Sequence, residues 1–148
     1  KPMLFISSSG LIDASDGNKQ FSALQGSFYR NRIAGLSFII GSVSMVGVPV
    51  FAGFISKMLF AFAGFGLTNK TIPTLIALAI STILNSIYFL RTSIRIVNTQ
   101  DVSTDVKIRL KDQKSYTLII IIFVLLNVFV GLHPQPIIDL IETGLAMF

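Results

Sequence analysis

The sequence predicts an all-α membrane protein, a polytopic transmembrane helix bundle in which one helix is discontinuous because glycine and proline break it. Hydrophobic residues make up 52% of the chain and charged residues only 13%, with a mean hydropathy of +0.75, whereas roughly a quarter of an ordinary soluble domain is charged. The apolar residues form long blocks separated by short polar stretches, as spanning helices and their loops do. One block is interrupted by the sequence GVPVFAG at 47–53.

We expect one transmembrane domain over residues 1–148 that was cut from a longer protein, because the chain enters an apolar run at once without a methionine or a cleavable signal. Thr71 and Pro73 predict the cap and first turn of the longest helix. Polar connections are expected over 13–32 and 98–115. The expected spans are 1–12 as a partial helix, 33–48, 50–65, 72–97 and 116–132, with an amphipathic tail at 137–148.

The blocks at 33–48 and 50–65 are both short, because a helix of this length covers about 24 Å and the hydrocarbon core is about 30 Å thick. Pro49 lies between them, and proline removes a hydrogen-bond donor and disfavours helix in the residue before it. Two arrangements remain open: a tight turn that reverses the chain, or a helix broken inside the membrane. Gly47, Pro49 and Gly53 are the residues expected to shape this break.

Basic residues indicate how the chain is oriented. Six of them surround the connection at 98–115, which the positive-inside rule therefore places in the cytoplasm, and the expected location is the inner membrane of a bacterial cell. If the chain reverses at Pro49, the connection at 13–32, which has three basic residues, falls on the opposite face. The six residues are Arg91, Arg95, Lys107, Arg109, Lys111 and Lys114.

Lys57 stands among apolar neighbours shortly after the break. Charged groups at membrane depth are rare and usually functional. Since desolvation disfavours the ammonium form, a lysine there could gain and lose a proton and act as a proton relay. A broken helix next to it would supply carbonyl ends and dipoles. The alternative is a lysine near a helix end that snorkels to the headgroups.

Other polar residues could extend a proton path. Lys1, followed by Pro2 and an apolar run, is a candidate for a second intramembrane base. Ser56 and Asn85 are candidates for a polar lining, although residues of this kind also form ordinary interhelical hydrogen bonds. The same two interpretations apply to Ser42, Ser44, Ser81 and Asn127.

The composition argues against several other classes of function. The chain has no cysteine and one histidine, His133, at a helix end, so we predict no metal site. No phosphate-binding loop, dinucleotide fingerprint or nucleophile elbow is present, and we expect no cofactor and no catalytic centre within the chain. The basic excess is explained by loop placement, so no nucleic-acid partner is expected.

Four segments carry a family resemblance: KPMLFISSSG, GSVSMVGVPVFAGFISK, NSIYFLR and GLHPQPIIDLI. In this order and spacing they resemble the later part of the antiporter-like membrane subunits of respiratory complex I (NADH-quinone oxidoreductase) and of Mrp-type cation/proton antiporters, which have relatives in membrane-bound hydrogenases. The run at 47–57 is the most specific part. The resemblance implies that Lys57 is similar to the family's lysine on a discontinuous helix of the second half-channel, and that Lys1 is similar to the lysine before the LF-containing helix.

The resemblance also implies proton translocation by a multisubunit complex, driven by quinone-linked redox chemistry in other subunits or by cation exchange. The partners would be other membrane subunits, the lipid bilayer and protons, with Na⁺ as an alternative coupling ion. The residues of the first half-channel belong to sequence outside this chain. The rival interpretation is a non-conducting structural membrane subunit that packs against its partners while Lys57 snorkels.

Overall fold

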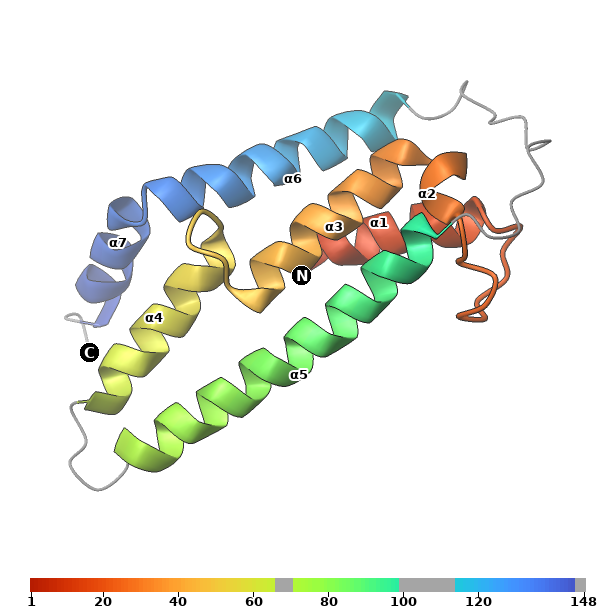
Figure 1. Ribbon diagram of the computed structural model, residues 1–148. Coiled ribbons are helices and arrows are strands. Elements are labelled where there is room, and N and C mark those ends of the chain that lie inside the picture. The colour runs from red at the N-terminus through yellow and green to blue at the C-terminus, as the bar shows by residue number, and fades with distance from the viewer. Residues whose placement is uncertain (66–70, 99–113, 146–148) are drawn as a thin grey trace.

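The structure is a computed structural model that describes residues 1–65, 71–98 and 114–145. These residues form an all-α membrane helix bundle and contain no strand, which confirms the predicted fold class (Figure 1). Most of the basic connection at 98–115 and the end of the predicted tail lie outside the described residues. The helices are α1 (Pro2–Asp13), α2 (Ser27–Arg30), α3 (Arg32–Val46), α4 (Ala52–Phe65), α5 (Thr71–Val97), α6 (Lys114–Leu132) and α7 (Gln135–Leu145).

Within the described residues, two helices are long and apolar enough to cross a membrane on their own. These are α5, with 27 residues, and α6, with 19. At 1.5 Å per residue α5 is about 40 Å long, which exceeds the hydrocarbon thickness of about 30 Å. The apolar helices α3 and α4 are each shorter than this requirement, and together they are about as long as α5.

Helices α3 and α4 follow one another in the same direction, and α5 runs antiparallel to both (Figure 1). The contacts along α5 establish this order. Phe38 of α3 meets Phe89, with ring centroids 6.5 Å apart, whereas Lys57 of α4 contacts Thr82. Further along, the Thr71 hydroxyl donates to the Gly64 carbonyl near the end of α4.

The sequence of these contacts along α5 shows that the chain does not reverse at Pro49. The structure therefore has the broken helix and not the reversing turn. It follows that the connection before α3 lies at the same end of the bundle as the C-terminal end of α5, not on the opposite face. There the Arg95 guanidinium lies 5.9 Å from the centre of the Phe21 ring. The Tyr116 hydroxyl at the start of α6 donates to the Ile6 carbonyl of α1, which packs at the same end.

The packed core lies in the same part of the bundle, between α1, α3 and α5. Leu11, Ala34, Phe38 and Ile96 form its buried centre. Small residues allow the close approach: a Cβ added to Gly41 would lie 2.9 Å from Leu4 Cγ. The buried serines of α1 and α3 satisfy their hydroxyls mainly on their own helices, for example Ser42 on the Phe38 carbonyl at 2.7 Å. Apolar side chains and hydroxyl groups therefore make up the buried side chains of this core, while the Nε atoms of Arg30 and Arg95 at the same end are buried without a hydrogen-bond partner among the described residues.

The outer faces of α5 and α6 expose large apolar side chains along most of their length. Isoleucines and leucines at 76, 80, 83, 87, 90 and 94 of α5 are all more than half exposed. Such an exposed apolar surface along two long helices is typical of helices that contact lipid or neighbouring membrane helices.

Candidate functional site

Lys57 projects from the second turn of α4 into the space between the two half-helices and α5. Its Nζ donates a hydrogen bond to the Val46 carbonyl at 2.7 Å and another to Thr82 Oγ1 at 2.9 Å. The Thr82 hydroxyl itself donates to the Leu78 carbonyl at 2.8 Å. The lysine nitrogen is therefore bonded to α3 and α5 while its backbone belongs to α4.

The Val46 carbonyl is available because α3 ends at Val46. Gly47 adopts φ +93°, a left-handed conformation that glycine adopts without strain and that commonly terminates helices. The amides of Gly47 and Val48 bond back to the carbonyls of Ser44 and Val43. A Cβ on Gly47 would lie 2.9 Å from Lys57 Cδ. Glycine at this position thus ends α3 and also leaves room for the lysine side chain.

The remaining residues of the break keep the two half-helices close. Pro49 lies in the exposed part of the turn, where its missing N–H is not required, and the Val50 and Phe51 amides both bond to the Val48 carbonyl. Gly53, in the first turn of α4, lies directly against α3, because an added Cβ would overlap the Ser44 carbonyl oxygen. Gly47, Pro49 and Gly53 all lie at the break in the structure.

A side chain of α6 also reaches the break. Asn127 Oδ1 accepts hydrogen bonds from Ser44 Oγ at 3.0 Å and from the Ala52 amide at 3.2 Å. One turn later on the same helix, Gly131 lies so close to the turn that an added Cβ would overlap the Val50 carbonyl oxygen. The break is therefore packed between α5 on the Lys57 side and α6 on the Asn127 side.

The Lys57 contact lies near the middle of the bundle. Thr82 comes 11 residues after the start of α5, or about 16 Å along a helix of about 40 Å. The Val46 carbonyl lies a full α3 length, about 22 Å, from the opposite end of the broken helix. Lys57 Nζ therefore contacts part-buried protein groups near the middle of the bundle's length and not at either end.

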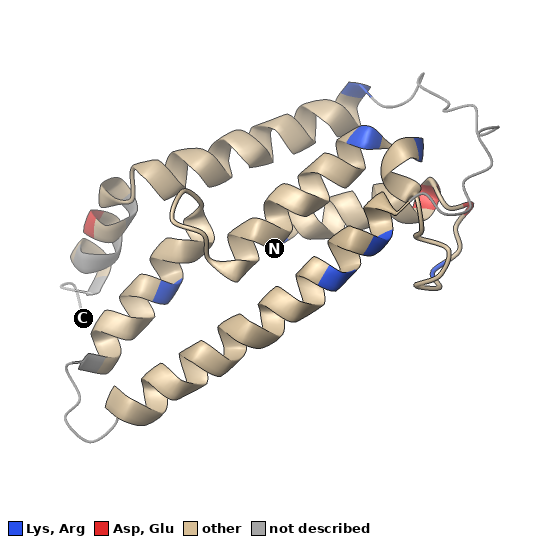
Figure 2. Cartoon of the chain, in the orientation of Figure 1, with Lys and Arg blue, Asp and Glu red and all other residues tan. Residues whose placement is uncertain are grey.

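The electrostatic surroundings of Lys57 are unusual for a lysine. Helices α3, α4, α5 and α6 contain no aspartate or glutamate, and no carboxylate of the described residues bonds to Lys57. The favourable contribution comes instead from the C-terminal end of α3, whose exposed carbonyls carry partial negative charge. Figure 2 shows most other basic residues gathered at the end of the bundle near α2, the end of α5 and the start of α6.

Both protonation states of Lys57 can satisfy these two acceptors. An ammonium has three N–H donors, and a neutral amine still has two N–H groups plus a lone pair. The Thr82 hydroxyl can accept from the lysine or turn to donate to it, because a hydroxyl is both donor and acceptor. In either protonation state Lys57 can keep its hydrogen bonds to the Val46 carbonyl and the Thr82 hydroxyl, and the ammonium has one further N–H beyond these two acceptors.

The other predicted site residues are not joined to Lys57. Lys1 is exposed at the start of α1, near the middle of the bundle in Figure 1, and shares no hydrogen bond with Lys57. Ser56 is exposed and donates to the Gly53 carbonyl at 3.2 Å. Asn85 is half-buried on α5, one turn beyond Thr82, and its side chain has no hydrogen bond to a described residue. Their role as a proton path remains a prediction.

Sequence reasoning missed Thr82 and the bridging role of Asn127. A signal for Thr82 exists in the sequence, because Thr82, Asn85 and Ser86 are spaced to share one face of an otherwise apolar helix. No local pattern shows that Asn127 would contact a segment 75 residues earlier.

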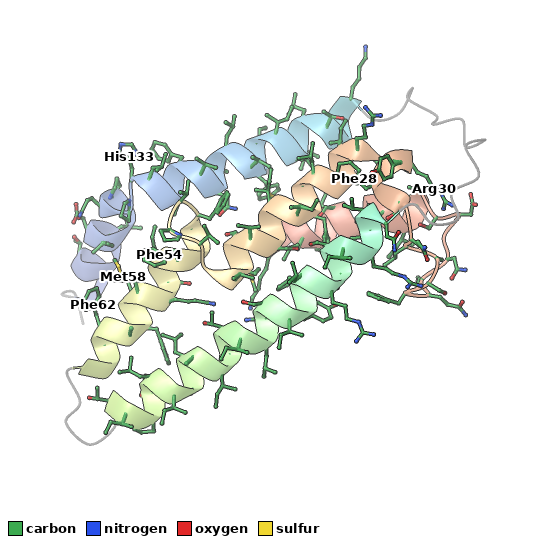
Figure 3. All side chains as sticks on the ribbon, in the orientation of Figure 1. Phe28, Arg30, Phe54, Met58, Phe62 and His133 are labelled. Atoms are coloured by element: carbon green, nitrogen blue, oxygen red, sulfur yellow. The ribbon has the colours of Figure 1, made fainter. Side chains whose placement is uncertain are left out.

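His133 lies at the junction of α6 and α7, where its ring stacks on Phe129 with centroids 5.6 Å apart. Figure 3 shows Phe54, Met58 and Phe62 on the side of α4 that faces α7, with His133 near the start of that helix. Within the described residues, no group of three or more His, Cys, Asp or Glu side chains could hold a metal ion.

The fold and the site define a class of protein: a polytopic helical membrane protein whose broken helix carries a lysine at mid-bundle. The model of the family described as "NADH:quinone oxidoreductase/Mrp antiporter, TM" matches residues 1–85. Because this match covers more than half of the chain, the chain belongs to that family.

A relative within this class is NADH-quinone oxidoreductase subunit N of Blochmanniella floridana, to which the chain is 28% identical over 124 residues. The alignment covers 79% of this chain and 24% of the relative, so the chain spans about a quarter of that protein's length. No solved structure matches the chain.

Proposed function

We propose that the chain is part of a proton-translocating membrane subunit in a multisubunit complex I-like or Mrp-type assembly, with Lys57 as its intramembrane proton relay. The observation that carries the proposal is the position of Lys57 Nζ, 2.7 Å from the Val46 carbonyl and 2.9 Å from Thr82 Oγ1. This part-buried position lies near the middle of the bundle's length, and Lys57 has no carboxylate partner among the described residues. Family membership supports the multisubunit membrane complex.

The proposed chemical step is proton exchange at one nitrogen. Lys57 accepts a proton from a donor that reaches its lone pair, holds the ammonium against the negative end of α3, and releases the proton to the next acceptor. No covalent bond between heavy atoms changes. The proposed driving force is quinone-linked redox chemistry or cation exchange in other subunits of the assembly. Lys1 is proposed as a further member of the same path.

The test is proton translocation by the full-length parent complex in proteoliposomes with Lys57→Ala and Lys57→Arg. Alanine removes the titrating group. Arginine keeps a positive charge and several donors but does not deprotonate. Both variants should lower the rate of proton translocation at least tenfold, which corresponds to an increase of about 1.4 kcal/mol in the activation free energy. Lys114→Ala, which removes an exposed lysine at the start of α6, is the matched control and should translocate protons like wild type.

Assembly of each variant must be verified in the same preparation. If the Lys57 variants assemble and pump protons at the wild-type rate, the relay is wrong. In that case the second candidate, a non-conducting membrane subunit that packs against partners, gains support. The observation that favours this candidate is the extended apolar surface of α5 and α6, which is the surface that lipid or partner helices would cover.

A further inference from the structure

We propose that Asn127 is the positioning residue of the helix break: its side-chain oxygen holds the first turn of α4 against the last turn of α3. The distance between Lys57 and the Val46 carbonyl is then set by α6. The consequence for proton transfer rests on the function proposed above, whereas the positioning itself does not.

Helices α3 and α4 obtain the caps of their first turns in different ways. The first turn of α3 is capped locally, because Asn31 Oδ1 accepts from the Ala34 amide three residues later at 3.1 Å. The residues before α4 are Pro49, Val50 and Phe51, and none of them has a side-chain acceptor. The Ala52 amide instead donates to Asn127 Oδ1 at 3.2 Å. Asn127 therefore supplies from α6 the cap that the sequence before α4 lacks.

A cap supplied by another helix has consequences inside a membrane. The first N–H groups of a helix have no partner within it, and the hydrocarbon region offers no water to replace one. Removing the Asn127 oxygen would leave the Ala52 amide unsatisfied, and the first turn of α4 would gain by moving or fraying. Because Lys57 comes five residues after Ala52, a shift there changes where its nitrogen lies.

The same oxygen also bonds to α3, and a second residue of α6 packs against the turn. The Ser44 hydroxyl, in the last turn of α3, donates to the same Oδ1 at 3.0 Å. One turn along α6, Gly131 admits the Val50 carbonyl where a Cβ would overlap it. Asn127 and Gly131 thus form one face of α6 against which the whole break packs.

The experiment measures hydrogen exchange of the break in the full-length parent protein, assembled in its complex in nanodiscs. The variants are Asn127→Ala, which removes the acceptor, and Asn127→Asp, which keeps an acceptor oxygen in the same place. Leu125→Ala is the matched control, because it also removes a side chain of α6 beyond Cβ, but one that is exposed. Segment 47–56 should exchange about tenfold faster in Asn127→Ala, with α5 unchanged. Asn127→Asp and Leu125→Ala should remain close to wild type.

Proton translocation is measured on the same preparations, and Asn127→Ala should lower it about tenfold or more through displacement of Lys57. If the alanine variant does not assemble, Asn127→Gln replaces it. That variant moves the oxygen by one methylene and should also speed exchange of segment 47–56.

Unchanged exchange of segment 47–56 in Asn127→Ala, or in Asn127→Gln where that variant is used, overturns the inference. So does faster exchange in Leu125→Ala to the same extent, because the effect would then not depend on the oxygen. Faster exchange together with normal translocation in Lys57→Ala leaves the positioning role standing and refutes the proposed function. The two failures are therefore distinguishable.

Discussion

At the scale of single residues, Thr82 is the group that fixes Lys57 to a spanning helix. It contributes the only side-chain partner of Lys57 among the described residues. Thr82→Val keeps the shape but removes the hydroxyl, so the lysine would lose a hydrogen-bond partner in a low-dielectric region. We expect a several-fold lower rate of proton translocation in Thr82→Val and a near-normal rate in Thr82→Ser. Equal rates for both variants in proteoliposomes would show that the hydroxyl plays no part.

Gly47 combines backbone and side-chain demands at one position. Gly47→Ala places a Cβ in a left-handed conformation, at a cost of about 1–2 kcal/mol, and brings it to 2.9 Å from Lys57 Cδ. Gly17→Ala is the matched control, because Gly17 also has a positive φ (+75°) but nothing within 4 Å of an added Cβ. Both variants should lower thermal stability of the assembled subunit. Only Gly47→Ala should also lower translocation per assembled complex, and equal translocation in the two variants would contradict the contact with Lys57.

At the scale of helices, the break depends on a close approach that only glycine permits. Gly131→Ala would insert a methyl group where the Val50 carbonyl lies, and overpacking of this kind costs typically 1–3 kcal/mol. The turn at 47–51 or α6 must then move. We expect a lower melting temperature of the assembled subunit, measured by loss of its native fluorescence or by aggregation on heating. Gly144→Ala, whose added Cβ meets nothing within 4 Å, should leave that temperature unchanged or raise it slightly because alanine favours helix.

At the scale of the whole molecule, the broken helix decides which connections share a face of the membrane. Because α3 and α4 run in one direction, the connection at 14–31 lies at the same end of the bundle as the C-terminal end of α5 and the start of α6. Nine of the 12 lysines and arginines are in or beside this connection and the one at 98–113. They are Lys19, Arg30, Arg32, Arg91, Arg95, Lys107, Arg109, Lys111 and Lys114. The positive-inside rule therefore leads us to propose that this whole end faces the cytoplasm.

This orientation is testable with a membrane-impermeant thiol reagent on intact cells and on inverted vesicles. Single cysteines at Ser22 and Lys114, both exposed at the basic end, should react only in inverted vesicles. A cysteine at Gln135, exposed at the start of α7, should react in intact cells. The arrangement with a reversing turn at Pro49 instead requires Ser22 and Lys114 to react from opposite sides, so labelling of these two positions discriminates between the topologies directly.

The sequence predicted much of this molecule because its strongest signals are local. A run of apolar residues long enough to cross a bilayer indicates a spanning helix wherever it lies, and the helices α5 and α6 follow from composition and length alone. Glycine and proline at 47–53 predict an interruption for equally local reasons, since positive φ and a missing N–H are properties of single residues. Lys57 was recognisable because a lysine surrounded by apolar residues is exceptional.

Contacts between distant segments could not be read in this way. The direction of α4 relative to α3, the partners of Lys57 and the reach of Asn127 to Ala52 depend on how helices pack, and no spacing along the chain encodes them. Composition and local pattern by themselves determined that this is an all-α membrane protein with an interrupted helix and a lysine beside the interruption. The tertiary structure alone decided that the helix continues past the break and that its lysine meets a carbonyl and a hydroxyl at mid-bundle. The physical reason is that unsatisfied backbone groups at that depth must find partners on other helices.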